Sequence, residues 1–271
     1  MLKAGVDKRI KDRIDKLKSG IARNKFLLDI SYPARQQSKD KYTVKISVKW
    51  IENFLPELLV LIKSIRPHFD KIWDQNRIVA SYLLLGKAYK ILESILCIAK
   101  EGYSSSIVEL ARSGQEAIDL VFLFSNDKSD KFLKLWFKGE IVGNSESRKI
   151  IDQSVNQMYA AFNKSLPVKK AKDDIYWVYS LYTHSGYATI IEMIDVFHED
   201  FDFETYAGFH FIRRNFHLVF NLVVNILLGI KNTAIVCNDS EILSKVNLKL
   251  KKFQSFFASP EEIDSIYSRY K

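Results

Sequence analysis

The sequence contains few of the residues that interrupt regular structure. Among 271 residues there are ten glycines and five prolines, well below average usage. Apolar residues recur at three- and four-residue steps along most of the chain, which is typical of helices. Sustained strand alternation bounded by Asn-Gly or Asp-Gly turns is absent. The sequence therefore predicts an all-α protein, an irregular multi-helix bundle with a basic N-terminal helical arm.

Cysteine and long apolar runs are also scarce. The two cysteines, Cys97 and Cys237, stand in contexts that favour core or element-end positions over a disulfide framework. The longest apolar run, residues 218–230, contains two asparagines and is shorter than the roughly 20 residues that span a bilayer. No apolar segment of a secretory signal follows the basic start. We therefore expect a cytoplasmic protein without a transmembrane segment.

Motifs that bind common cofactors are missing. The chain has no phosphate-binding G-x-x-x-x-G-K-[ST], no dinucleotide-binding G-x-G-x-x-G after a strand and no G-x-S-x-G nucleophile turn. His198, His210 and the acidic residues of HEDFDFET could in principle ligate a metal ion, but such a charge run is more typical of a solvated loop. We expect no cofactor and no metal.

Positive charge is concentrated at the N-terminus. Residues 1–49 contain 14 Lys or Arg against five Asp or Glu, whereas residues 50–271 contain 27 of each. We therefore divide the chain into a basic N-terminal helix and linker, residues 1–49, and a helical bundle domain, residues 50–271. Within the first part, residues 4–30 have a helical pattern, and residues 31–50 suggest an extended linker or helix entry.

The bundle domain contains successive helical patterns separated by Gly, Pro and charged segments. Pro67 ends the first pattern and Gly102 ends the second, while Ser106 and Glu109 form a capping-box pattern at the next. The expected helices cover residues 50–66, 69–100, 106–124, 130–142, 148–163, 174–185, 190–197, 205–231, 240–257 and 259–270.

The most apolar of these helices carries an unexpected polar stripe. Arg213, His217, Asn221 and Asn225 follow one another at four-residue steps within an otherwise apolar surface. Because a buried polar group without a hydrogen bond costs about 1–3 kcal/mol, this stripe requires partners. The sequence therefore predicts polar side chains on the helices that pack against it.

Two other helices offer matching stripes. One carries Glu109, Arg112, Glu116 and Asp119 on a single face, where Arg112 and Glu116 can pair at i and i+4. The other carries Tyr176, Ser180 and His184 four residues apart, with Asp173 and Tyr187 nearby. We expect the three stripes to meet in one polar cluster inside the bundle.

Each stripe also has a purely structural interpretation. The Glu109 stripe can be a solvated face, and His184 can be a core histidine bonded to a neighbour. Asn221 and Asn225 can form a hydrogen-bond ladder that fixes helix register. The cluster as a whole favours function, because buried arginines are expensive without an anionic partner.

Short motifs on these helices support a family resemblance. R-S-G-Q-E at residues 112–116, F-L-K-L-W-F-K-G-E, and Y-W-V-Y-S-L-Y-T-H at residues 176–184 resemble a bacterial all-helical domain-of-unknown-function family. Its members have R-x-x-x-E on one helix and Y-x-x-x-S-x-x-x-H on a later one. The resemblance covers residues 70–230 and implies that Arg112, Glu116, Tyr176, Ser180 and His184 are the shared positions.

That family is remotely similar to the HEPN nucleases of toxin–antitoxin and phage-defence systems. HEPN proteins carry Arg, four to six residues and then His, which polarise a phosphodiester and activate a ribose hydroxyl. This chain departs from the pattern, because Arg213 and Arg214 precede His217 with only three and two residues between.

Two functions follow from these patterns. In the first, the protein is a ribonuclease-like enzyme or phosphate-ligand-binding protein that acts on RNA or a nucleotide. Arg112 and Arg213 would then hold phosphate, with Tyr176 and Ser180 as further substrate-binding residues. His184, His217 and Glu116 would be catalytic, since histidine serves as a general acid or base near neutral pH.

In the second, the protein is a non-enzymatic interaction or scaffold protein. The polar cluster would be structural, and residues 1–30 would form a homodimer or dock a partner protein through the apolar seam of Val6, Ile10, Ile14 and Leu17.

Overall fold

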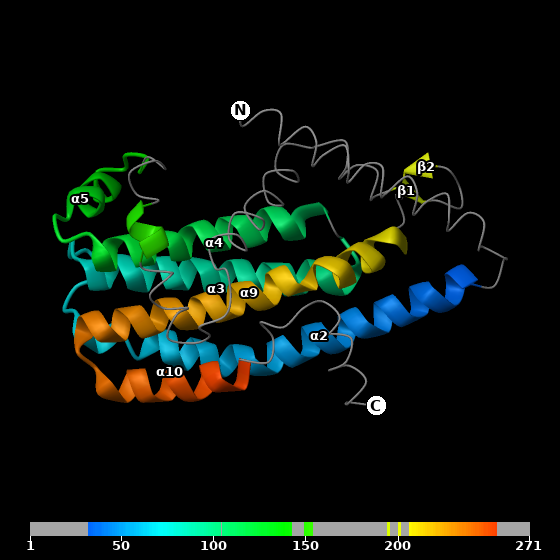
Figure 1. The fold of residues 1–271 in the computed structure, drawn as a ribbon, viewed down its shortest axis with the longest axis horizontal. Helices are drawn as coiled ribbons and strands as arrows, with labels where there is room; N and C mark the ends of the chain where they lie inside the picture. Colours follow the sequence, from blue (N-terminus) through cyan, green and yellow to red (C-terminus); the bar gives the residue numbers. More distant parts are fainter. Residues whose placement is uncertain are drawn as a thin grey trace.

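The chain folds into a bundle of long helices, which confirms the all-α class. The computed structural model describes residues 32–103, 105–142, 149–153, 194–195, 200–201 and 206–253. Its elements are α2 (Tyr32–Lys63), the 3₁₀ turn η1 (Arg66–His68), α3 (Arg77–Glu101), α4 (Ser105–Asn126), α5 (Lys131–Phe137), β1 (Ile194–Asp195), β2 (Asp200–Phe201), α9 (Tyr206–Cys237) and α10 (Ser240–Phe253) (Figure 1). Residues 149–153 are also helical.

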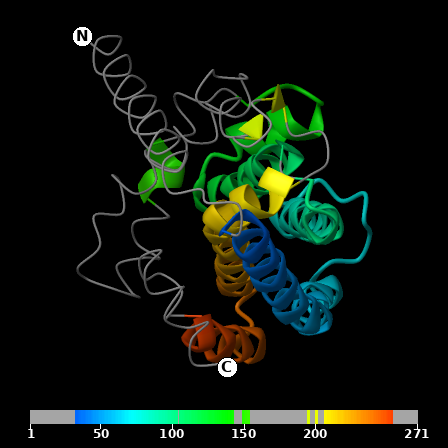
Figure 2. The ribbon, with the colours of Figure 1, turned by 90° about the vertical axis from the view of Figure 1, so that its right-hand side faces the viewer.

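Helix α9 is the centre of the bundle. It packs against α2, α3, α4 and α10, and Figure 2 shows it beside α2 with α10 below. Almost every apolar residue of α9 from Phe216 to Ile230 is buried. The largest fully buried side chains elsewhere include Ile51, Leu58, Leu85, Leu92, Phe122 and Phe124. Burial of each such side chain stabilises the fold by about 1.5–3 kcal/mol, so α9 is the element that the other helices must cover.

The apolar character of α9 also makes it resemble a membrane span. Among the helices described, its segment Phe216–Cys237 alone is long and apolar enough to cross a bilayer, and 72% of that window is buried inside the bundle. A buried helix of this composition is what the core of a helical protein requires.

Of the two states expected for residues 31–50, an extended linker or a helix entry, the structure shows helix from Tyr32 onward. Helix α2 runs without a break through that segment, and the proposed boundary between residues 49 and 50 lies inside it. Val44 and Val48 are buried in the core. Tertiary burial therefore overrides the β-branched pattern that suggested an extended chain. The helical pattern over residues 4–30 lies outside the described residues.

Two other expected helices also differ from the structure. Helix α3 begins at Arg77 rather than near residue 69, because the Asn76 side chain caps it by accepting hydrogen bonds from the backbone N–H groups of Ile78 and Val79, both at 3.0 Å. Within the expected helix 190–197, Ile194–Asp195 instead pairs antiparallel with Asp200–Phe201. Isoleucine suits an extended chain as well as a helix.

Gly102 ends α3 as predicted, and its position requires glycine. Its φ is +85°, and the backbone N–H of Tyr103 donates to the carbonyl of Ile98 at 3.2 Å, as in a Schellman cap. A Cβ at this position would lie 2.8 Å from the ring of Phe209. The C-terminal end of α3 therefore packs directly against the N-terminal part of α9.

Asp127 organises the connection from α4 to α5. Its carboxylate accepts hydrogen bonds from the Ser129 hydroxyl (2.6 Å), the Ser129 N–H (3.0 Å) and the Phe132 N–H (3.1 Å), and the residue is 5% exposed. Burial, the largest influence, raises the pKa of Asp127, but the bonds from Ser129 and Phe132, helped by the charge of Arg77, outweigh it and leave the pKa below its ordinary value.

We predict that Asp127→Ala destabilises the protein by about 2 kcal/mol near neutral pH, the cost of leaving buried donors without an acceptor. Because the folded-state pKa is lowered, this stabilisation is present above the unfolded-state value of about 3.9 and is lost as the pH falls through the folded-state pKa. Urea unfolding at a series of pH values should therefore show that the difference in the free energy of unfolding between wild type and variant becomes smaller in acid.

The matched control is Asp70→Ala, which removes an exposed aspartate. It should change the free energy of unfolding by less than about 0.5 kcal/mol at every pH. A gap for Asp127→Ala that stays constant down to pH 3 would contradict this role of the carboxylate.

Candidate functional site

The polar stripes of α4 and α9 meet in the interior. Asn225 donates from Nδ2 to Oε1 of Gln115 at 2.6 Å, and Gln115 donates from Nε2 to Oδ1 of Asp119 at 3.0 Å. All three side chains are at most 9% exposed. This polar seam fixes the register of α4 against α9, because any slip would leave buried amides without partners.

The N-terminal end of the α9 stripe contacts α2 instead of α4. Nη1 of Arg213 donates to Oδ1 of Asp40 on α2 at 2.8 Å. Asp40 is 1% exposed and the Arg213 side chain 21%. Each four-residue step rotates the stripe by about 40° around the helix, so positions 213 and 225 face different neighbours.

Arg112 and Glu116 form the ion pair that their spacing predicts, with Nε and Oε1 2.9 Å apart. The Arg112 side chain is 25% exposed and that of Glu116 54%. This pair lies at the outer edge of the α4 face, whereas Asp119 on the same face is buried.

The remaining predicted site residues are described only in part. His217 and Asn221 are half-buried on α9. Tyr176, Ser180 and His184 lie outside the described residues, as do Asp173 and Tyr187. The described contacts therefore join the α4 and α9 stripes through Asn225, and join Arg213 to α2; the catalytic roles of His184, His217 and Glu116 stay predictions.

Two partners of these stripes were missed in the sequence. Gln115 could have been found, since it precedes Asp119 by four residues and an i, i+4 Gln–Asp bond is a known helix pairing. Asp40 could not, because the segment containing it was interpreted as a linker. Its burial follows from the packing of α2 on α9.

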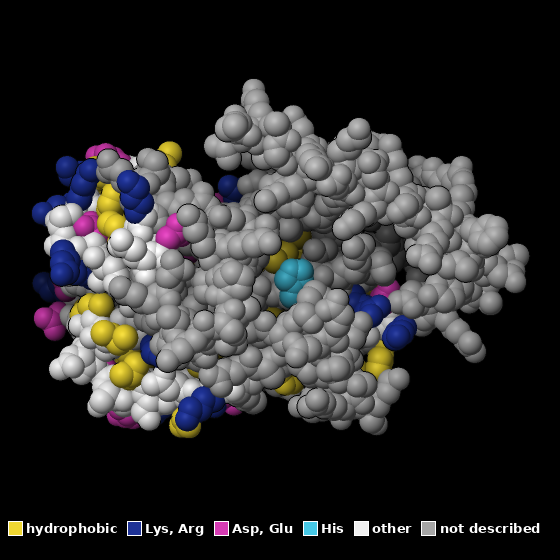
Figure 3. Space-filling model, in the orientation of Figure 1, with side chains coloured by type: hydrophobic (Ala, Val, Ile, Leu, Met, Phe, Trp, Pro, Cys, Tyr) yellow, Lys and Arg dark blue, Asp and Glu magenta, His cyan; other side chains and the backbone are white. Residues whose placement is uncertain are grey.

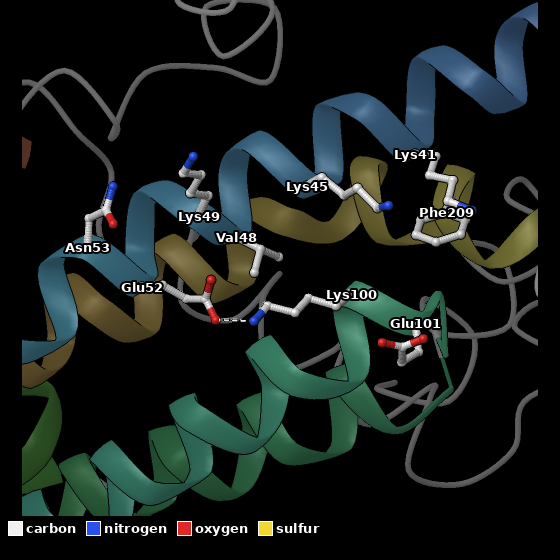
Figure 4. Close-up of a pocket in the computed structure, with 9 residues that line it drawn as sticks. All are labelled: Lys41, Lys45, Val48, Lys49, Glu52, Asn53, Lys100, Glu101 and Phe209. Atoms are coloured by element: carbon white, nitrogen blue, oxygen red, sulfur yellow. Dashed lines mark ion pairs between the residues drawn. The ribbon is translucent and has the colours of Figure 1, made fainter.

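A cleft of about 590 Å³ opens between α2, the end of α3 and the start of α9. Its lining is dominated by lysines, with two carboxylates and two apolar side chains. The lining residues are Lys41, Lys45, Val48, Lys49, Glu52, Asn53, Lys100, Glu101 and Phe209 (Figure 4). We call this space the lysine cleft.

Helix α2 supplies most of the positive charge of the lysine cleft. Lys41, Lys45 and Lys49 follow one another at four-residue steps, and like charges at this spacing destabilise a helix by about 0.2–0.5 kcal/mol per pair. Among the described residues, no carboxylate pairs with Lys45 or Lys49. Lys41 lies over the ring of Phe209, with its Nζ 5.4 Å from the centroid.

Glu52 and Lys100 form an ion pair across the lysine cleft, from α2 to α3 (Figure 4). The hydrogen bond to Glu52 raises the pKa of Lys100 above its ordinary value, and the charge of Glu52 adds to the rise although partial burial opposes it. Lys100 is therefore positively charged at neutral pH, and the carboxylate of Glu52 already neutralises this charge.

Elsewhere on the described surface, opposite charges are mixed. Lys245 pairs with Glu241 at 2.6 Å, and Lys249 pairs with Glu57. The coloured part of Figure 3 likewise shows Lys and Arg beside Asp and Glu. The lysine row of α2 differs from this pattern.

The described part of the chain contains no cluster of side chains suited to binding a metal ion. No group of three or more His, Cys, Asp or Glu side chains there could hold a metal ion. His198 and the side chain of His210 lie outside it.

Comparison with protein-family models, curated proteins and solved structures gives no match. The resemblance to the bacterial helical family and to HEPN nucleases therefore stays a prediction.

We predict that Arg213→Ala lowers the free energy of unfolding by about 3 kcal/mol. It removes the guanidinium from a carboxylate that is 1% exposed, and breaking a buried pair from one side is strongly destabilising. Urea unfolding followed by circular dichroism measures this loss.

Two variants serve as controls. Asp40→Asn with Arg213→Gln removes both charges and should be more stable than Arg213→Ala alone. Arg112→Ala breaks an outer pair of the same type and should cost less than about 1 kcal/mol. If Arg213→Ala and Arg112→Ala lower the free energy of unfolding equally, the Arg213–Asp40 pair does not stabilise the fold more than an outer ion pair does.

Proposed function

We propose that the protein binds a phosphate-bearing ligand in the lysine cleft. The observation that carries this proposal is the row of Lys41, Lys45 and Lys49, whose like charges line a cleft and are left largely uncompensated by the described carboxylates. Such a row costs the isolated helix free energy, and an anionic ligand would convert that cost into attraction.

The size and lining of the lysine cleft suit this role. Its volume of about 590 Å³ lies within the range of small-molecule sites, which is roughly 300–1,000 Å³. Lysine ammonium groups bind phosphate as point charges on flexible stems. Val48 and Phe209 contribute the apolar part of the lining, but both are largely buried, so the charged groups dominate what the cleft offers to a ligand.

The geometry favours binding over the hydrolase hypothesis. The two arginines expected to hold phosphate, Arg112 and Arg213, each donate to a carboxylate, Glu116 or Asp40. Among the described residues, Lys41, Lys45 and Lys49 of α2 form no ion pair with a carboxylate. A HEPN-like ribonuclease built on His184 and His217, and a scaffold that oligomerises through residues 1–30, stay predictions from the sequence.

We predict that Lys45→Gln with Lys49→Gln weakens binding of pyrophosphate and of ATP by about tenfold, corresponding to about 1.4 kcal/mol. Both substitutions remove charge at exposed helical positions, where glutamine keeps a good helix propensity. Isothermal titration calorimetry with the full chain at low salt measures the change.

The control is Lys71→Gln with Lys87→Gln, which removes the same charge from exposed positions outside the lysine cleft. It should leave affinity within twofold of the wild type. If both double variants weaken binding equally, the affinity depends on the net charge of the protein alone, which would contradict a site in the cleft.

We also predict that Glu52→Gln strengthens pyrophosphate binding by about three- to tenfold. The substitution removes the carboxylate that neutralises Lys100, so that this lysine can turn to the ligand. Glu57→Gln, which breaks a comparable pair with Lys249 outside the cleft, should have no such effect. Unchanged or weaker binding in Glu52→Gln would mean that Lys100 does not contribute to the site.

A further inference from the structure

We infer that the ligand of the lysine cleft is a linear chain of phosphates that runs along α2, rather than a single phosphate group. This inference rests on the proposed function and names the class of ligand.

The spacing of the lysines is the first argument. Successive lysines of the row are four residues apart, which places them about 6 Å apart along the helix axis, and Lys41 and Lys49 about 12 Å apart. One phosphate group is too small to contact the whole row. A chain of phosphates can place a negative charge beside each lysine in turn.

The directions of the side chains are the second argument. Figure 4 shows Lys41 and Lys45 both extending toward Phe209, whereas Lys49 points away from Lys100 and from the other two lysines. The three ammonium groups therefore do not converge on one point, as they would around a single anion. Lys41 is further held in place by its contact with the Phe209 ring.

The charge of the chain is the third argument. The lysine row is the C-terminal end of the basic segment 1–49, which contains 14 Lys or Arg, while the rest of the chain is balanced. A sequence with this excess of positive charge suits a polyanionic ligand better than a small anion.

Recognition of this kind depends on the phosphates. Phe209 is 8% exposed, so it cannot provide an open face for base stacking, which is the usual aromatic contribution to single-strand binding. Inorganic polyphosphate and single-stranded nucleic acid share the required chemistry, a flexible chain of negative charges.

The test compares four probes on the full chain: pyrophosphate, ATP, inorganic polyphosphate of about 20 phosphates and an oligo-dT of about 20 nucleotides, each titrated at several salt concentrations. We expect the two polymers to bind at least 100-fold more tightly than pyrophosphate. Each phosphate contact along a single strand should contribute roughly −0.7 to the slope of log K against log salt.

The decisive variant is Lys41→Gln with Lys45→Gln and Lys49→Gln. It should make the slope for oligo-dT less steep by about 2, which is three contacts at 0.7 each, and the slope for polyphosphate should also become less steep. Lys63→Gln with Lys71→Gln and Lys87→Gln removes the same charge elsewhere and should leave the slope within about 0.5 of wild type. Circular dichroism melts establish that both triple variants are folded.

The outcomes separate the two proposals. If pyrophosphate binds as tightly as the polymers, and loses affinity in the Lys45/Lys49 variant, the linear chain is wrong but the phosphate site stands. If the polymers bind with an unchanged slope in the decisive variant, they are held elsewhere and the inference is overturned. If no probe binds, the proposed function fails as well. Tighter binding of oligo-dT than of polyphosphate, with both slopes reduced in the decisive variant, would support the chain and assign nucleic acid as its source.

Discussion

The structure depends on the burial of most of α9. A helix this apolar must be covered over most of its surface, and close packing around it requires small residues at the crossings. A Cβ on Gly114 of α4 would lie 2.9 Å from Leu222, and one on Gly229 of α9 would lie 3.1 Å from Leu85 of α3. Since protein interiors are close-packed, these glycines set how near α3 and α4 approach. The polar groups of α9 must then find partners at fixed positions.

Those partners determine where the other helices lie. The Asn225–Gln115–Asp119 contacts hold α4, and the Arg213–Asp40 pair holds α2. Val44 and Val48 of α2 are buried in the core. At about 100° per residue, Lys41 lies close to the direction of Val48, and Lys45 and Lys49 lie successively further round the helix. The row therefore begins beside Phe209 of α9 and turns outward along the lysine cleft. The position of the candidate site is therefore a consequence of how α2 packs.

The sequence predicted the parts of this fold that have a clear helical period. Helices α3, α4, α9 and α10 and the stop at Gly102 follow from apolar spacing and from turn residues. The segment KYTVKISVKW misled the prediction, because its alternating β-branched residues are also compatible with a strand. Its helical state is decided by burial against α9, which is a long-range contact. Because this segment was interpreted as a linker, Asp40 could not be recognised as the partner of Arg213, and the lysine row could not be recognised as part of a candidate site.

The contacts of each cation explain why we propose phosphate ligands other than the arginines that the sequence pattern suggested. Arg213 is a conspicuous residue in an apolar helix, but its partner Asp40 is 1% exposed, and separating a buried pair costs about 3–5 kcal/mol. A hydrogen bond between charged groups returns only about 1.5–3 kcal/mol, so a phosphate would not repay the release of Arg213 from Asp40. Lys45 has no comparable tie among the described residues and loses little on meeting an anion. For this reason the phosphate site proposed above is placed on the exposed lysines of α2 and not on Arg213.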